Sequence, residues 1–387
     1  MKKLFAMSMA ALAVTACTNE DVLTPNEAQN GNALTFSTYV PTTKATTQEA
    51  FKPGDKFGVF AAYTGETDFK VDVNYAFNFM NDQAVEMNNS GEWFYNPVKY
   101  WPKSGVATLE RVHFFAYHPM IQDAAALSLA EGDVVVPATK GLKITYKADK
   151  LENQVDFLVA RAYNQTEGDN SGKAFAESND AAGGLVQLRF QHALYRVGYK
   201  VKLVGMPLDK NTSVRIDSIS FGHKEHTIEA TAAGAEVKKP AGVPVLISSA
   251  DYDFLSMYPF INKNGFVEKS SDRFTATLLS KDLTYNATFD KGSSAITIEN
   301  KPDDYLMLIP QSLSAAAHVS IEYTIITEDE DGFGSTKEVH NIAQFPINKE
   351  MVAGKAYTWT FEIGLTAVDF DVDVQSWGTE DNKTVEP

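Results

Sequence analysis

Cysteine is almost missing from this sequence of 387 residues, which contains a single one, Cys17. One cysteine cannot form a disulfide within the chain, and a zinc or iron–sulfur site built on cysteine needs several thiolates. Positive charge is also scarce, because 34 Lys and Arg stand against 50 Asp and Glu, giving a net charge of −16. This balance argues against nucleic acid as a partner, since phosphate binding requires a concentrated basic surface.

Long hydrophobic runs are missing as well. The one extended apolar run, residues 4–16, is shorter than the roughly 20 residues of a bilayer-spanning helix. It follows Lys2 and Lys3 and ends in Val14-Thr15-Ala16-Cys17, which resembles a bacterial lipobox. The sequence therefore predicts a lipoprotein signal peptide over residues 1–16 and lipidation of Cys17 by diacylglycerol and palmitate. The alternative is a buried core cysteine that falls at this place by chance.

An acidic segment, Thr18-Asn19-Glu20-Asp21, comes directly after Cys17. It resembles the surface-export signal of lipoproteins in Bacteroidetes-type bacteria, and it also fits a simple solvated spacer. Both interpretations stay open at this point. Residues 18–31 are polar and lack periodicity, so they are expected to form a tether.

Alternation of apolar and polar residues, typical of half-buried strands, dominates the sequence from Leu34 onward. Such segments are residues 56–63, 112–117, 185–203, 214–221, 305–309, 319–326 and 357–363. Helical periodicity is limited to one or two turns at residues 123–130 and 312–317. Many short strands separated by turn residues predict an all-β protein made of antiparallel β-sandwiches. A boundary near residues 204–207 divides it into an N-terminal domain, 45–204, and a C-terminal domain, 205–387.

The sequence shows no motif for catalysis or for a cofactor. A Gly-x-Ser-x-Gly turn, a phosphate-binding glycine loop and a His-Glu-x-x-His helix are all missing. Of the seven histidines, only His223 and His226 lie close together, and their spacing places them on opposite faces of a strand. His192, in an apolar segment, is expected to be a hydrogen-bonded structural residue. We therefore expect no enzyme activity, no cofactor and no metal site.

An aromatic cluster spans residues 93–102. Its members could stack on sugar rings if they are exposed, but aromatic residues on strands more often pack in the core. Two functions are consistent with this cluster. One is a structural protein that buries these rings, and the other is a non-polymerising surface lipoprotein that binds glycans or host ligands through Trp93, Tyr95, Tyr100 and Trp101.

The whole chain resembles the fimbrillins, the pilin-like lipoproteins that form type V fimbriae in Bacteroidetes. The resemblance rests on an ordered set of segments rather than on one motif. After the lipobox these are Phe57-Gly58-Val59-Phe60-Ala61, Tyr100-Trp101-Pro102, Phe115-Ala116-Tyr117-His118-Pro119, Asp156-Phe157-Leu158-Val159-Ala160, Phe190-Gln191-His192-Ala193-Leu194, Leu308-Ile309-Pro310-Gln311-Ser312-Leu313, Val352-Ala353-Gly354-Lys355-Ala356-Tyr357, Phe361-Glu362-Ile363 and Val372-Asp373-Val374-Gln375-Ser376-Trp377.

The resemblance implies two tandem transthyretin-like β-sandwich domains and polymerisation by protease-triggered strand exchange. It implies export as a surface-exposed outer-membrane lipoprotein and incorporation into a fimbrium that supports cell adhesion. The partners would be other fimbrial subunits, either identical or accessory, a trypsin-like maturation protease, the outer membrane, and host or bacterial surface ligands. Whether the subunit forms the stalk, the anchor or the tip stays open.

Two further features of the sequence agree with this mechanism. Lys44 is the one basic residue between Cys17 and Phe51, so a trypsin-like protease would cut there and leave Ala45 as the new N-terminus. Known oral members carry Arg at the matching place, which leaves the protease unidentified. Cleavage at this bond would remove the tether and first strand, residues 17–44. That strand alternates, and its apolar face presents Leu34, Phe36 and Val40, with Thr38 as a polar exception on the same face.

A second alternating segment, residues 366–377, lies near the C-terminus. Its apolar side chains, Val368, Phe370, Val372 and Val374, are separated by Asp369, Asp371 and Asp373. A strand with one apolar face can fill a groove left by another strand, so this segment is the candidate donor. The alternative is that both segments are permanent strands of a monomer.

Overall fold

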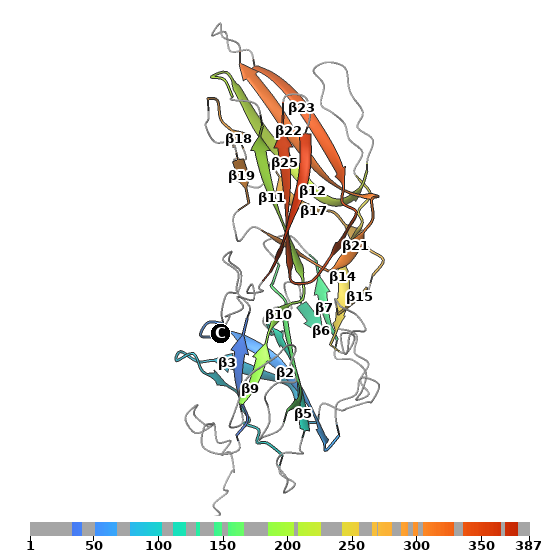
Figure 1. Cartoon of the computed structure of the whole chain (residues 1–387). Helices are drawn as coiled ribbons and strands as arrows, with labels where there is room; N and C mark the ends of the chain where they lie inside the picture. The colour runs from blue at the N-terminus through green and yellow to red at the C-terminus, as the bar shows by residue number, and fades with distance from the viewer. Residues whose placement is uncertain are drawn as a thin grey trace, which may run out of the picture.

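The fold is known from a computed structural model, and every described element of secondary structure is a β-strand (Figure 1). The structure describes residues 33–40, 51–67, 78–102, 111–120, 129–131, 143–148, 154–165, 185–204, 208–225, 242–254, 265–268, 270–280, 288–292, 297–300, 305–328, 336–364 and 368–377. Within these ranges no helix occurs, so the prediction of an all-β protein is confirmed. Figure 1 shows an elongated molecule with strands from the two halves of the chain at opposite ends.

The N-terminal end is built on a six-stranded antiparallel sheet. In spatial order its strands are β10 (Gln191–His192), β8 (Leu158–Gln165), β5 (Arg111–His118), β2 (Lys56–Gly65), β3 (Met80–Met87) and β4 (Trp93–Phe94). Two further strands, β1 (Thr35–Tyr39) and β9 (Leu185–Arg189), form a separate parallel pair. Side chains of β1 and β9 join those of the large sheet in one hydrophobic cluster.

The central strands of this sheet are apolar on both faces. Phe57 and Val59 of β2 belong to the cluster shared with β1, whereas Phe60 belongs to a second cluster on the opposite face. Phe114 and Phe115 of β5 divide in the same way. A strand that is covered on both sides needs apolar residues at consecutive positions, which explains why these segments do not alternate strictly.

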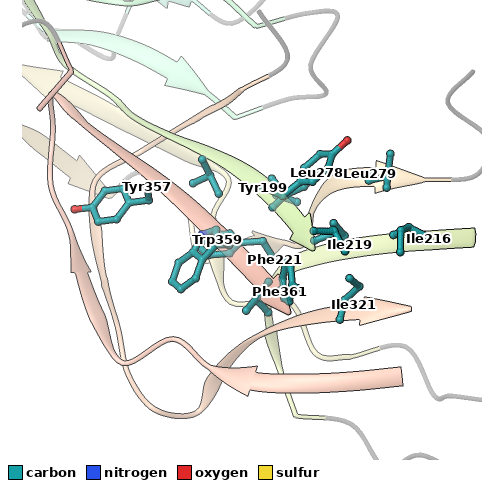
Figure 2. Packing of buried hydrophobic residues seen from close by; sticks show 14 of the residues in the cluster. Tyr199, Ile216, Ile219, Phe221, Leu278, Leu279, Ile321, Tyr357, Trp359 and Phe361 are labelled. Atoms are coloured by element: carbon teal, nitrogen blue, oxygen red, sulfur yellow. The ribbon is translucent and has the colours of Figure 1, made fainter. Parts of the chain in front are cut away.

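The C-terminal end is a sandwich of two five-stranded sheets. One sheet contains β19 (Thr297–Glu299), β11 (Tyr195–Leu203), β25 (Lys355–Ile363) and β26 (Val368–Ser376), with β20 (Leu306–Leu308) also beside β11. The other contains β17 (Ala276–Ser280), β12 (Thr212–Lys224), β22 (Ala317–Glu328) and β23 (Thr336–Pro346), with β18 (Thr288–Phe289) also beside β12. The inward side chains of both sheets pack together around Trp359 and Phe221 (Figure 2).

Strand β12 shows how the sequence pattern sets this packing. Val214 and Ile216 point into the core, and after a shift of one residue Ile219 and Phe221 continue the buried face. The pairing of β12 with β22 contains a bulge at this shift, between Ile216 and Ser218. An extra residue in one strand changes which alternate positions face inward, so the bulge keeps the apolar residues in the core.

A four-stranded sheet lies between the two ends and draws strands from both halves of the chain (Figure 1). It consists of β15 (Phe266–Glu268), β14 (Ser249–Asp253), β7 (Lys143–Lys147) and β6 (Leu129–Glu131). Two small antiparallel pairs complete the described strands, β13 (Leu246–Ile247) with β16 (Arg273–Phe274), and β21 (Gln311–Leu313) with β24 (Lys349–Met351).

Several expectations can be compared with these elements. The segment 185–203, expected as one strand, forms three, and the last of them, β11, pairs with β25 of the C-terminal sandwich. One sheet thus contains strands from both sides of the expected boundary at residue 204. The prediction of a helical turn at residues 312–317 is wrong, because residues 312–313 belong to β21 and residue 317 begins β22. Of the other expected helical turn, residues 129–130 belong to β6, and residues 123–128 lie outside the described part.

Candidate strand-exchange site

Strand β1, the segment expected to be removable, lies at the N-terminal end of the molecule against β9. The two strands run parallel in register, from Thr35 opposite Leu185 to Tyr39 opposite Arg189. At its beginning, the N–H of Leu34 donates to the carbonyl of Lys99 at 2.9 Å. At its end, the carbonyl of Tyr39 accepts from the N–H of Phe190 at 2.8 Å. Non-covalent contacts on two sides therefore hold β1 in place.

The three apolar residues predicted on the inner face of β1 are all buried. Leu34 is 0% exposed, Phe36 is 5% and Val40 is 6%. The Phe36 ring lies at the centre of an aromatic group, with its centroid 5.6 to 5.9 Å from the rings of Phe57, Tyr95 and Phe114. Burial of such side chains stabilises a fold by about 1.5–3 kcal/mol each, so β1 contributes substantially to the N-terminal core.

The polar exception on this face, Thr38, has a defined partner. Its Oγ1 accepts a hydrogen bond from the indole Nε1–H of Trp93 at 3.0 Å. Tyr95 also binds the strand, because its hydroxyl donates to the carbonyl of Leu34 at 2.7 Å. Burial raises the pKa of Tyr95 well above its usual value, so the phenol stays protonated and remains a donor. We call β9, Trp93, Tyr95, Lys99 and the core side chains that contact β1 the β1 site.

The outward side of β1 carries one exposed contact. The Tyr39 side chain is 45% exposed, and the Arg189 guanidinium carbon lies 5.9 Å from its ring centroid. A cation above an aromatic face is a weak attraction at an exposed position. This contact leaves a positive charge of β9 beside the last residue of the removable strand.

The aromatic cluster expected as a possible sugar platform does not form one. Trp101 is 2% exposed and Tyr95 is 8% exposed, and both belong to the core that contains β1. Trp93 packs against the same core while its indole binds Thr38. Tyr100, at 54%, is the one exposed residue of these four. The rings therefore build the β1 site rather than an exposed stacking surface.

The candidate donor segment forms β26, an edge strand that pairs antiparallel with β25 of the same chain. Val368, Phe370 and Val372 are half-buried against the C-terminal core, whereas Val374 is 41% exposed. Phe370 lies between two parallel rings, with centroid distances of 4.7 Å to Phe345 and 5.2 Å to Trp359. Asp369, Asp371 and Asp373 face solvent. Burial thus alternates from Val368 to Asp373 and is shallow, and Val374 departs from the pattern.

The residue after β26 is buried far more deeply than the strand. Trp377 is 3% exposed, and its ring stacks on His192 at a centroid distance of 3.9 Å and an angle of 13°. His192 in turn has its Nδ1 3.0 Å from a carboxylate oxygen of Asp156, as expected for a structural histidine. The Arg196 guanidinium lies 5.3 Å from the Trp377 ring centroid. Sequence reasoning missed this contact because the residues are distant in sequence.

The residues predicted for maturation lie outside the described part of the chain. Cys17, the lipidation site, belongs to residues 1–32, and Lys44 and Ala45, which flank the expected cleavage, belong to residues 41–50. Lipidation and cleavage therefore stay predictions. Among the described residues, no helix is long and apolar enough to cross a membrane.

Of the two histidines that lie close together in the sequence, only His223 belongs to the described residues. His223 is buried, with its Nε2 3.1 Å from Ser320 Oγ, while His226 lies outside the described residues. Across the part of the chain that the structure describes, no group of three or more His, Cys, Asp or Glu side chains could hold a metal ion.

Buried His113 should make the protein sensitive to acid. Burial, reinforced by the Arg111 charge, lowers the pKa of His113 from 6.5 to about 3, and its Nε2 lies 2.7 Å from Thr64 Oγ1. Because the unfolded chain binds this proton near pH 6.5 and the folded chain does not, stability falls as pH decreases from about 6.5 toward 3. We expect a loss of about 2 kcal/mol in unfolding free energy between pH 7 and pH 5, measured by urea denaturation. His113→Gln should flatten this slope, and an unchanged slope would contradict the assignment.

Comparison with known proteins gives one family match and a set of related folds. Residues 43–377 match a family model described as fimbrillin-like. A fimbrial protein from Bacteroides vulgatus shares the fold with a TM-score of 0.64 and 18% sequence identity, over 89% of this chain and 99% of that one. No curated protein sequence matches the chain.

Two further solved structures show weaker likeness. A candidate cell adhesion protein from Bacteroides uniformis has a TM-score of 0.45 and 14% identity, over 89% of this chain and 97% of that one. Another from Bacteroides eggerthii has a TM-score of 0.43 and 11% identity, over 89% and 95%.

Proposed function

Because the chain belongs to the fimbrillin-like family, we propose that it is a structural subunit of a surface fimbria that polymerises by protease-triggered strand exchange. Cleavage after Lys44 frees β1, and the β26 segment of another subunit takes its place. The observation that carries the proposal is the match between these two strands. Both present apolar side chains to one face at the same two-residue spacing, and both are held by contacts that a substitute strand could reproduce.

The match extends to the order of side chains. With Val368 at the position of Leu34, Phe370 takes the position of Phe36, and Val374 takes that of Val40. The aromatic ring of Phe370 would therefore lie among Phe57, Tyr95 and Phe114, where the Phe36 ring of β1 lies. Because the sequence order is preserved, the donor would run parallel to β9, as β1 does.

Five of the seven positions differ between β1 and the donor in this register, and two of these differences change a side-chain contact of β1. Asp373 takes the position of Tyr39, opposite Arg189, so a carboxylate replaces an aromatic ring beside a guanidinium. An exposed pair of this kind contributes up to about 1 kcal/mol and favours the correct register. Val372 takes the position of Thr38, so Trp93 Nε1 would lose its acceptor, at about 1 kcal/mol.

The remaining features of the proposal concern location and partners. The precursor would reach the cell surface as an outer-membrane lipoprotein acylated on Cys17, and a trypsin-like protease would release it for assembly with other fimbrial subunits. The fimbria would support cell adhesion through host or bacterial surface ligands. We propose no enzymatic activity, in agreement with the family's structural role.

Limited digestion of the purified full chain with trypsin tests the proposal. The expected product starts at Ala45 and forms SDS-resistant oligomers or filaments, as followed by N-terminal sequencing, gel electrophoresis and electron microscopy. Lys44→Gln should abolish both cleavage at this bond and polymerisation. The matched control, Lys52→Gln, removes the next basic residue and should leave both unchanged. Cleavage at Ala45 without any oligomer would overturn strand exchange.

A further inference from the structure

The residue after β26 makes the deepest contact of this segment, in addition to the pairing of β26 with β25. Within residues 368–377, only Trp377 is buried, while the rest are half-buried or exposed. The Trp377 N–H donates to the carbonyl of Gly354, and the Gly354 N–H donates to the carbonyl of Leu194 at 2.8 Å. Its ring stacks on His192. A strand with shallow burial along its length thus depends on residues 192–194 for its deepest contact.

The residues just before this segment, Arg189 and Phe190, contact β1. Arg189 lies beside the Tyr39 ring, and the Phe190 N–H donates to the Tyr39 carbonyl. The Phe190 side chain is fully buried, 5.5 Å from Phe57 between ring centroids, within the cluster that contains β1. Two residues later, His192 contacts Trp377. The removable strand and the candidate donor strand are therefore held by neighbouring residues of one segment.

We infer that residues 189–192 couple the two strands, so that docked β1 keeps Trp377 seated on His192 and restrains β26 until β1 leaves. This inference rests on the proposed strand exchange. Loss of β1 removes the acceptor of the Phe190 N–H and the ring beside Arg189, which leaves the segment less constrained. His192 then presents a less ordered surface to Trp377, and β26 opens more often. A subunit would in this way become a donor only after its own first strand has gone.

Coupling between two sites is reciprocal in free energy, so loosening either strand should loosen the other. This reciprocity distinguishes coupling between the two strands from a local loss of stability at the substituted residue. A purely local role of each contact predicts that a substitution affects only its own strand. The intact full chain is sufficient for the measurement, because amide hydrogen exchange reports opening without cleavage or polymer formation.

The experiment compares amide hydrogen exchange of the full chain with that of two variants. Trp377→Ala should accelerate exchange of β1 amides about tenfold, and Phe36→Asp should accelerate exchange of β26 amides to a similar extent. Gln375→Ala and Ser37→Asp are the matched controls, because these side chains are not buried in the two strands. Neither control should affect the opposite strand.

The amides of β5 provide an internal check, since this strand crosses the N-terminal core. If Phe36→Asp also accelerates amide exchange in β5, the N-terminal core has opened. The Trp377→Ala variant alone then tests the coupling. Acceleration confined to the substituted strand in Trp377→Ala would overturn the coupling. The polymerisation assay remains independent: polymers with uncoupled strands refute the coupling alone, and coupled strands without polymers refute strand exchange.

Discussion

A chain carrying Val374→Asp should fold as the unmodified chain does and fail to polymerise after cleavage. In the single chain Val374 is 41% exposed, so a carboxylate there remains hydrated and disturbs little. In the proposed register the same side chain takes the position of Val40, which is 6% exposed in the N-terminal core. An unpaired buried charge costs several kcal/mol, and each 1.4 kcal/mol is about a tenfold change in an equilibrium constant. We expect at least about a hundredfold loss of polymer.

The matched variant is Val374→Leu, which keeps an apolar side chain and should polymerise after cleavage. Folding of both variants is compared by thermal unfolding of the intact chain, and polymer yield is measured after complete cleavage at Lys44. Val372→Thr serves as a second control, because it restores the acceptor that Trp93 has in β1. Normal polymers from Val374→Asp would rule out this register of β26.

Phe370 is a less selective target for the same question. Its ring lies between Phe345 and Trp359 in the single chain, so Phe370→Asp would loosen β26 from its own sandwich as well as impair donation. A substitution at Val374 separates loosening of β26 from impaired donation, because its side chain is exposed in the single chain and, in the proposed register, would be buried in the polymer. The difference in exposure between Val374 and Val40 is what makes the test informative.

The strands themselves could be predicted from the sequence wherever one face is buried. Residues 214–221 and 357–363 alternate and form β12 and β25, because only one side of each meets the core. Residues 185–203, expected as one strand, divide into three. Their alternation changes phase at residues 193–195, where the chain passes from the N-terminal core to the C-terminal core. The helical turn expected at 312–317 failed because Leu313 and Ala317 are buried from two different strands.

The apolar face of β1 could be predicted from the sequence, whereas the residues of the β1 site that contact it could not. Leu34, Phe36 and Val40 follow from spacing alone, and all three are buried. The parallel partner β9 lies some 150 residues away in sequence, and pairing between strands leaves no local signal that names the partner. Thr38 looked like an exception to the apolar pattern, because its partner, the Trp93 indole, is also distant.

The contact between Trp377 and His192 illustrates the same limit. Both residues occur in segments on which the fimbrillin resemblance rests, as do Asp156 and Gly354. The structure brings these four segments together at one junction, through the ring stack, the Asp156 contact and the Gly354 hydrogen bonds. Sequence order alone places the segments one after another and gives no reason for them to meet.

A disulfide between β1 and β9 should switch polymerisation off and on in one sample. Ser37 and Gln187 lie opposite each other in register and are half-buried beside the inner face. Neighbouring strands are about 4.8 Å apart, within the roughly 4.4–6.8 Å that a disulfide spans between Cα atoms. In the Ser37→Cys, Gln187→Cys chain with Cys17→Ser, oxidation should hold β1 in place after cleavage and prevent oligomers. Reduction should restore them.

The measurement combines N-terminal sequencing, which shows that Ala45 has been exposed, with electrophoresis before and after addition of a reducing agent. The chain with Ser37→Cys and Cys17→Ser alone should polymerise in both conditions. Oligomers from the cleaved and oxidised double-cysteine chain would mean that β1 is not the strand that leaves. Because the same molecules are compared before and after reduction, a folding defect of the variant cannot produce the expected difference. Departure of β1 is thereby tested separately from cleavage, which the protease completes in either state.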